Sequence, residues 1–206
     1  MSDPDLLVLK DHFQRSFAAA GLATPQGVFE ALVSRYSEPS RAYHTLQHIG
    51  EGIAHLKTVR SAPPEVAIAW WFHDAIYDPR RQDNEEKSAA WARAVLGDGP
   101  LKAKVETLIL ATKAGAAAGD PGARLMVDVD LAILAAPEPR YSEYEAQIRH
   151  EYAFVNEATY RAERQNVLRS FTGRAYIYAT PEFRNLETRA RKNLERSINA
   201  LIVAKK

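Results

Sequence analysis

Apolar residues recur at three- and four-residue spacing along almost the whole chain, and strict alternation over more than four residues is scarce. This period is typical of one face of an α-helix and not of a strand. Prolines and glycines flank the apolar runs, as expected at helix ends. The pattern therefore predicts an all-α fold, with residues 1–206 forming a single compact bundle of about eight to ten helices.

The predicted helices are placed by signals at their ends. These signals are Asp3-Pro4, Thr24-Pro25 and the pair Asp83 and Glu86, which has the form of a capping box. The predicted helical ranges are 3–20, 24–36, 43–59, 65–76, 83–96, 101–112, 125–134, 141–154, 158–171 and 181–203. A loop of small residues is expected at 115–122.

The segment 65–76 is apolar almost all round, which predicts a helix at the centre of the bundle. His73 and Asp74 lie within this segment, and burying such groups without partners is costly. A divalent cation could satisfy both side chains together, since its charge offsets the loss of water around the carboxylate.

Composition narrows the chemistry that the chain can perform. With 27 Lys and Arg against 26 Asp and Glu, the net charge of +1 provides no bulk field for a long polyanion, so nucleic acid is not an expected partner. The absence of Cys leaves His, Asp and Glu as the strong metal ligands. No segment approaches the roughly 20 apolar residues of a membrane span. We therefore expect no membrane partner and a cytoplasmic protein.

Further candidate ligands lie on either side of the His73-Asp74 pair. His44 and His48 are four residues apart and share one face of a predicted helix. Asp128 and Asp130 lie among apolar residues, where an unmatched carboxylate would be expensive. Either acid could instead lie at the start of a helix, as an N-cap or in the first turn. We expect one of the two to complete a set with His48, His73 and Asp74.

Four runs of the sequence carry a resemblance to a known family: RAYHTLQH at 41–48, WFHDAIYD at 71–78, DNEEKSA at 83–89 and DVDLAIL at 128–134. In order and spacing they resemble the HD-domain metal-dependent phosphohydrolases of bacteria. The resemblance implies a metal-site core at about 41–135, with C-terminal helices at 140–204 packing on it. It also implies His48, His73, Asp74 and Asp130 as metal ligands, with Asp128 beside them as a supporting residue or alternative ligand.

The same resemblance suggests residues that move protons. Tyr43-His44 followed by His48 is similar to the Tyr-His-Asn-x-x-His run of cyclic-nucleotide phosphodiesterases, with Thr45 in place of Asn, and it implies that His44 donates a proton to the leaving oxygen. Asp78 matches the last residue of the His-Asp-x-x-Glu-Asp run of alarmone hydrolases, which implies that it orients or deprotonates the attacking water.

The implied reaction is hydrolysis of a phosphoester of a small molecule, possibly a nucleotide, by water that one divalent metal ion activates. Nitrogen and oxygen ligands suit Mn, Mg, Fe, Co, Ni or Zn. Basic residues should hold the phosphate, and the candidates are Arg41, Lys113 and Arg149. Asn84 and Glu85 follow the His-Asp motif closely enough to border the pocket.

Two other functions fit the same residues. The chain could be a noncatalytic ligand-binding or regulatory module in which the metal is a structural staple. It could also be an oxygenase with two irons, as in a branch of the same superfamily. The second alternative is short of ligands, because no His lies between His73 and His150.

Overall fold

The computed structural model describes residues 3–114 and 119–203, and these residues form ten α-helices and two 3-10 helices without a strand. The predicted all-α bundle is therefore confirmed. Half of the predicted loop at 115–122, residues 115–118, lies outside the described residues. The elements are α1 (Asp3–Ala19), α2 (Val28–Tyr36), α3 (Leu46–Thr58), α4 (Pro64–Phe72), α5 (Asn84–Leu96), α6 (Pro100–Ala114), α7 (Pro121–Asp130), η1 (Leu131–Ala135), α8 (Glu138–Glu151), α9 (Glu157–Thr172), η2 (Pro181–Leu186) and α10 (Glu187–Val203).

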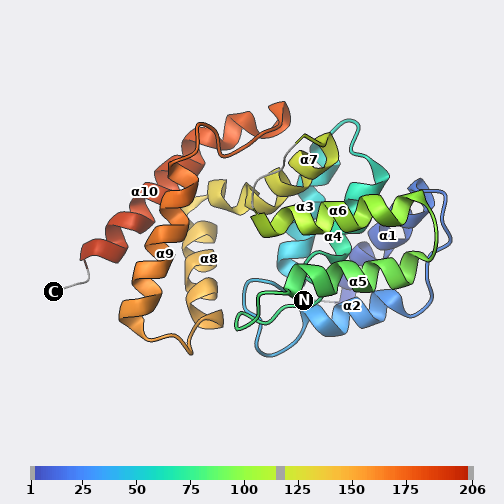
Figure 1. Ribbon diagram of the computed structural model, residues 1–206, viewed down its shortest axis with the longest axis horizontal. Coiled ribbons are helices and arrows are strands. Elements are labelled where there is room, and N and C mark those ends of the chain that lie inside the picture. Colours follow the sequence, from blue (N-terminus) through green and yellow to red (C-terminus); the bar gives the residue numbers. More distant parts are fainter. Residues whose placement is uncertain (1–2, 115–118, 204–206) are drawn as a thin grey trace.

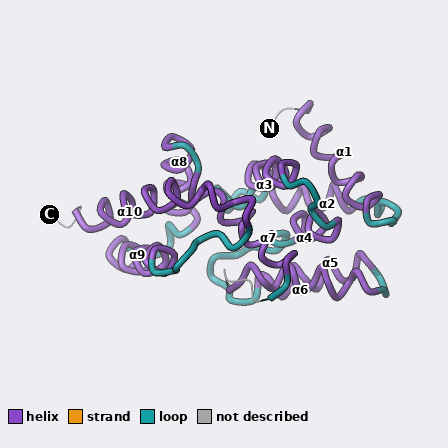
Figure 2. Tube along the Cα trace, turned by 90° about the horizontal axis from the view of Figure 1, so that it is seen from above, coloured by secondary structure: helices purple, strands orange, loops and turns teal. Residues whose placement is uncertain are grey.

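The helices fall into two groups that η1 connects (Figure 1). Helices α1 to α7 form one group, and α8, α9 and α10 form the other. The view from above shows the same division, with α9 and α10 at the C-terminal end (Figure 2). Among the helices described, none combines the length and apolar character that crossing a membrane requires.

Helix α4 lies at the centre of the first group, as its apolar sequence predicts. Trp70, Trp71 and Phe72 are fully buried, and α4 packs against α1, α3, α5, α6 and α7. The helix ends at Phe72, earlier than the predicted Ile76. His73 therefore lies at the C-terminal end of α4, where its backbone N–H still donates to Ala69 O at 2.9 Å.

Helices α2 and α3 begin later than predicted, α7 and α8 begin earlier, and one predicted cap is wrong. Helix α7 begins at Pro121 because the Asp120 side chain accepts a hydrogen bond from Ala123 N. Helix α3 begins at Leu46 because the Thr45 side chain accepts a hydrogen bond from Gln47 N, so the residues before Thr45 form a loop. Helix α2 begins at Val28 and not at position 24, because Gly27 adopts a left-handed φ of 74°. The Asp83 carboxylate forms no cap in the described chain and instead pairs with Arg81 and Lys87.

Helices α3 and α4 approach each other most closely at Gly52. A Cβ atom at this position would lie 2.0 Å from Cζ2 of Trp70. The Trp70 indole Nε1 donates to Ile49 O at 2.9 Å, and its ring stacks on His73 with centroids 4.3 Å apart. The small residue on α3 thus lets Trp70 hold His73 next to His48, which lies one turn earlier on α3.

Gly52→Ala is expected to lower the free energy of unfolding by about 1–3 kcal/mol, because the methyl group has no space beside Trp70. Gly50→Ala is the matched control on the same helix, since a Cβ there would meet Leu9 Cδ2 at an ordinary 3.9 Å. In the control, the free energy of unfolding should rise by up to about 1 kcal/mol, because Ala has a higher helix propensity than Gly. Urea unfolding of both variants measures the difference, and equal stabilities would contradict the packing argument.

Candidate metal centre

Three residues from three helical elements converge on one buried point. His48 on α3, His73 after α4 and Asp130 at the end of α7 place one ligand atom each within 4.8 Å of one another. The His48 Nε2 and His73 Nε2 atoms are 3.1 Å apart, and Asp130 Oδ1 lies 3.3 Å from His48 Nε2 and 3.7 Å from His73 Nε2. This group could hold a metal ion, as the sequence predicts for these three residues.

Asp74 lies beside the same group. Its Oδ2 atom is 2.9 Å from His73 Nε2 and 3.6 Å from His48 Nε2. The other ring nitrogen of His73, Nδ1, lies 2.9 Å from Trp70 O, which makes Nδ1 the donor and leaves Nε2 facing the cluster. Two imidazole nitrogens and two carboxylates form a donor set that suits a divalent ion.

The charges in the cluster favour a bound cation. Burial alone would lower the pKa of His73, but Asp74 and Asp130 outweigh it and raise this pKa to about 10. Burial would raise the pKa of each carboxyl, and the two imidazoles instead hold the pKa of both Asp74 and Asp130 below the ordinary value. Burial lowers the pKa of His48, so it is the proton on His73 that takes the place where a metal ion would provide positive charge, and release of this proton should accompany metal binding.

His44 lies near the cluster but outside α3, in the loop before Thr45. Its Nδ1 lies 2.7 Å from Glu151 Oε2, and its ring stacks on Tyr77 with centroids 3.9 Å apart. Because the carboxylate accepts, Nδ1 is the donor and Nε2 remains for other partners. Burial lowers the pKa of His44, but Asp74 and Glu151 together raise it above the ordinary value. The predicted shared helical face of His44 and His48 is wrong, because only His48 is helical.

Glu151 was not among the predicted site residues. Its Oε1 accepts hydrogen bonds from the backbone N–H groups of Ala42, Tyr43 and His44 at 2.8–3.0 Å, and its Oε2 accepts from Tyr77. The hydrogen bond and the charge of the His44 side chain, together with the backbone donors, overcome the effect of burial and lower the pKa of Glu151 to about 2. One buried carboxylate at the end of α8 thus orders the whole loop that carries His44.

Tyr43 is a second residue that the sequence did not single out as part of a site. Its side chain is buried, and its hydroxyl has no hydrogen-bond partner among the described residues. The ring lies between the cluster and α8, with its centroid 4.7 Å from that of His48 and 4.6 Å from that of Tyr144. A buried hydroxyl without a partner is costly, which points to a missing ligand or water at this place.

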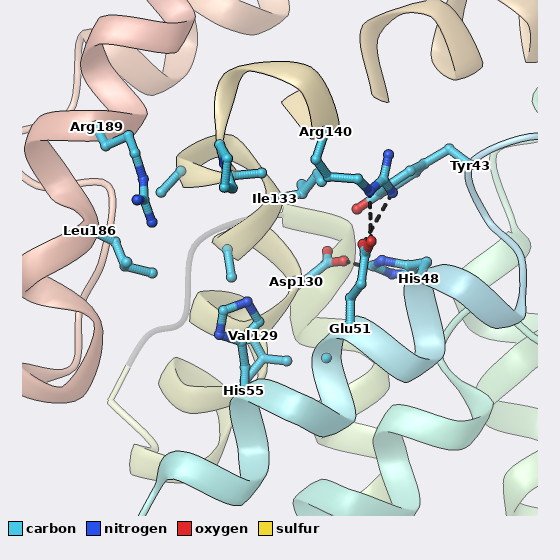
Figure 3. A pocket seen from close by; sticks show the side chains of 15 residues that line it. Tyr43, His48, Glu51, His55, Val129, Asp130, Ile133, Arg140, Leu186 and Arg189 are labelled. Carbon is cyan, nitrogen blue, oxygen red and sulfur yellow. Dashed lines mark hydrogen bonds and ion pairs between the residues drawn. The ribbon is translucent and has the colours of Figure 1, made fainter. Parts of the chain in front are cut away.

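Two cavities meet at the cluster, and Tyr43, Asp130 and Ile133 line both of them. The smaller cavity has a volume of about 210 Å³ and lies between α3, η1 and the start of α10 (Figure 3). The larger cavity has a volume of about 510 Å³ and extends between η1, α8 and α9, with His44 in its wall. Asp130 thus lines both cavities, and His48 lines the smaller one.

The structure does not bring the other predicted acids to the cluster. Asp128 is fully buried and accepts hydrogen bonds from Ala179 N and from the Thr180 N–H and hydroxyl, so it ties α7 to the segment before η2. Asp78 Oδ1 accepts from Arg80 N at 2.9 Å. The Asn84 side chain accepts a hydrogen bond from Asp78 N and donates one to Asp78 O.

Neither Asp78 nor Asn84 belongs to the described lining of the two cavities, and Glu85 is also absent from it. Asn84 therefore fixes the loop after the His-Asp motif and does not border the pocket. The described hydrogen bonds of Asp78 are with Arg80, Arg81 and Asn84, and none joins it to the cluster.

The three predicted phosphate-binding residues are committed to other contacts. Arg41 is buried and donates to His44 O, Asp74 O and Ala75 O, which joins the two loops that carry the cluster. Lys113 pairs with Glu86, and Arg149 donates to Glu157 and to the backbone after α8. None of the three lines either cavity within the described part of the chain.

Two other arginines lie in the wall of the smaller cavity (Figure 3). Arg140 pairs with Glu51 through its Nε at 2.6 Å. Arg189 is exposed and has no hydrogen bond or ion pair with the described residues, and Figure 3 shows it extending from α10 toward the cavity. Both residues follow the last motif, in C-terminal helices where arginines are frequent, so no sequence signal distinguished them.

Comparison with known proteins adds no relative: no family model, no curated protein and no solved structure matches this chain. The site is therefore interpreted from its own geometry.

Proposed function

We propose that this chain is a divalent-metal-dependent phosphohydrolase that acts on a small phosphoester. The observation that carries the proposal is that two members of the candidate metal group line cavities: His48 and Asp130 line the smaller cavity, and Asp130 also lines the larger one. A structural metal site is closed by protein ligands, whereas a catalytic site leaves room for substrate. The four motifs that resemble HD-domain phosphohydrolases support the same conclusion.

In this proposal, His48, His73, Asp74 and Asp130 hold the ion. When bound, the ion supplies Lewis acidity for a phosphoryl oxygen and for the attacking water. His44 holds a proton that it can donate from Nε2, since Glu151 engages its Nδ1 and its pKa is raised. Arg189 brings a positive charge to the other side of Asp130, where it can attract the phosphoryl oxygens.

The test is phosphate release by the full chain after removal of metal and addition of Mn²⁺, Mg²⁺, Fe²⁺, Co²⁺, Ni²⁺ or Zn²⁺ singly. The panel should contain monophosphate, diester and nucleotide substrates. We expect about one ion per chain and turnover of at least one phosphoester with at least one ion. Metal retention without any turnover would favour the noncatalytic module, and two irons per chain with oxygen consumption would favour the oxygenase.

A further inference from the structure

We infer that the larger cavity binds an uncharged aromatic ring and that this ring is the organic group of the phosphoester. The identification of the ligand as a phosphoester rests on the proposed function. The recognition of the ring rests on the cavity alone. Three features carry it: the rings in the wall, the pairing of the charged groups and the position of His44.

Six of the 17 residues that line the larger cavity are Tyr or Phe. They are Tyr43, Tyr77, Tyr144, Tyr152, Tyr160 and Phe171. Most of the remaining lining consists of Leu, Ile and Val side chains from η1, α8 and α9. A cavity of about 510 Å³ is within the usual range for a small ligand. Because aromatic rings pack well against the faces and edges of other aromatic rings, this wall favours binding of a ring over binding of a flexible polar chain.

The charges in this wall do not suit a polyphosphate. Arg164 is the cation among the described lining residues, and it is buried and committed to Glu145 at 2.6 Å and to the Tyr144 hydroxyl at 2.9 Å. The acids in the wall are Asp130 and Glu163. Because the ion would neutralise Asp130 in the proposed function, a chain of phosphates would meet the Glu163 carboxylate without an unpaired cation, and an uncharged group avoids this repulsion.

The position of His44 sets the direction of the substrate. His44 lines the larger cavity and not the described wall of the smaller one, which holds Arg140 and Arg189. With the ring in the larger cavity, the ester oxygen lies toward His44. Water oxygen bonds to phosphorus, the bond from phosphorus to the ester oxygen breaks, and that oxygen takes a proton from His44 Nε2. The attacking water leaves one of its protons on the phosphate and gives the other to His44, which restores the acid. The products are the hydroxylated ring compound and inorganic phosphate.

The first test compares two phosphomonoesters that both release an alkyl alcohol, 1-naphthylmethyl phosphate and glycerol 2-phosphate. The wild-type chain should hydrolyse the naphthylmethyl ester with kcat/KM about 10-fold higher or more. Phe171→Ala should raise KM for the naphthylmethyl ester about 3- to 10-fold, the usual size of one aromatic contact, and should leave the glycerol ester unchanged. Phe171→Leu keeps apolar bulk without the ring and should produce most of the same effect.

Phe154→Ala is the matched control, because Phe154 is exposed and is not among the described lining residues of the cavity. This variant should match the wild type with both esters. A chain that hydrolyses the two esters equally well, or a Phe171→Ala variant that weakens both equally, would overturn the inference.

Binding of 1-naphthol, measured by calorimetry on metal-free protein, separates this inference from the proposed function. We expect binding that Phe171→Ala weakens and Phe154→Ala does not. Such binding without hydrolysis of any phosphoester would support the ring site and count against the phosphohydrolase. Absence of naphthol binding to the folded wild-type chain would overturn the ring site even if phosphoesters are hydrolysed.

Discussion

His73→Ala is expected to reduce metal content from about one ion per chain to nearly none and to lower phosphate release by about 10³-fold or more. The imidazole contributes one of the two nitrogens in the cluster, and its Nε2 lies within 4 Å of ligand atoms from His48, Asp74 and Asp130. Loss of a metal ion removes several kcal/mol of transition-state stabilisation, and each 1.4 kcal/mol is about tenfold in rate.

The matched control is His150→Ala, since His150 is an exposed histidine on α8 and takes no part in the cluster. Metal analysis and phosphate release should both remain at wild-type values in this control. Circular dichroism of His73→Ala checks that loss of metal is not loss of the fold. A folded His73→Ala chain that keeps its metal would refute the assignment of the cluster.

The sequence predicted the residues of the cluster better than their surroundings, and the reason is the range of the contacts. His73 and Asp74 carry a local signal, because they lie within a strongly apolar run, whereas His48 was singled out by its spacing from His44. Glu151 carries none, since it bonds to His44 across 107 positions and resembles the many other acids of the C-terminal helices. Arg189 reaches the smaller cavity only through the packing of α10 against η1.

The choice between Asp128 and Asp130 shows what helical geometry adds. Residues two apart on an α-helix point about 200° from each other, so two such acids cannot serve one site. On α7, Asp130 faces the two histidines and Asp128 faces Thr180 on the opposite side. The sequence placed both among apolar neighbours, and only the orientation of α7 decides which carboxylate meets the cluster.

Glu151→Gln is expected to lower the free energy of unfolding by about 3 kcal/mol at pH 7. Folding lowers the pKa of Glu151 from about 4.5 to about 2, although burial acts in the opposite direction. Each unit corresponds to about 1.4 kcal/mol in favour of the folded, ionised state. This contribution is complete above about pH 4.5 and is lost as the pH falls toward 2. The stability of the variant should therefore approach that of the wild type over this interval.

Urea unfolding at pH 7, 5, 4 and 3 measures this convergence. Glu143→Gln is the matched control on the same helix, because Glu143 is exposed and its contact with Arg140 is a surface pair worth about 0–1 kcal/mol. The difference between this control and the wild type should stay within that range at every pH. A Glu151→Gln deficit that is constant with pH would show that packing, and not the ionised carboxylate, stabilises the loop.

The same substitution should change the rate of phosphate release and its pH profile. Without the carboxylate at Nδ1, the pKa of His44 falls, so the imidazole loses its proton at lower pH. If His44 acts as the proton donor, the basic limb of kcat moves to lower pH in Glu151→Gln, while metal content stays near one ion per chain. An unchanged basic limb in a folded, metal-loaded variant would exclude His44 as the acid that Glu151 orients.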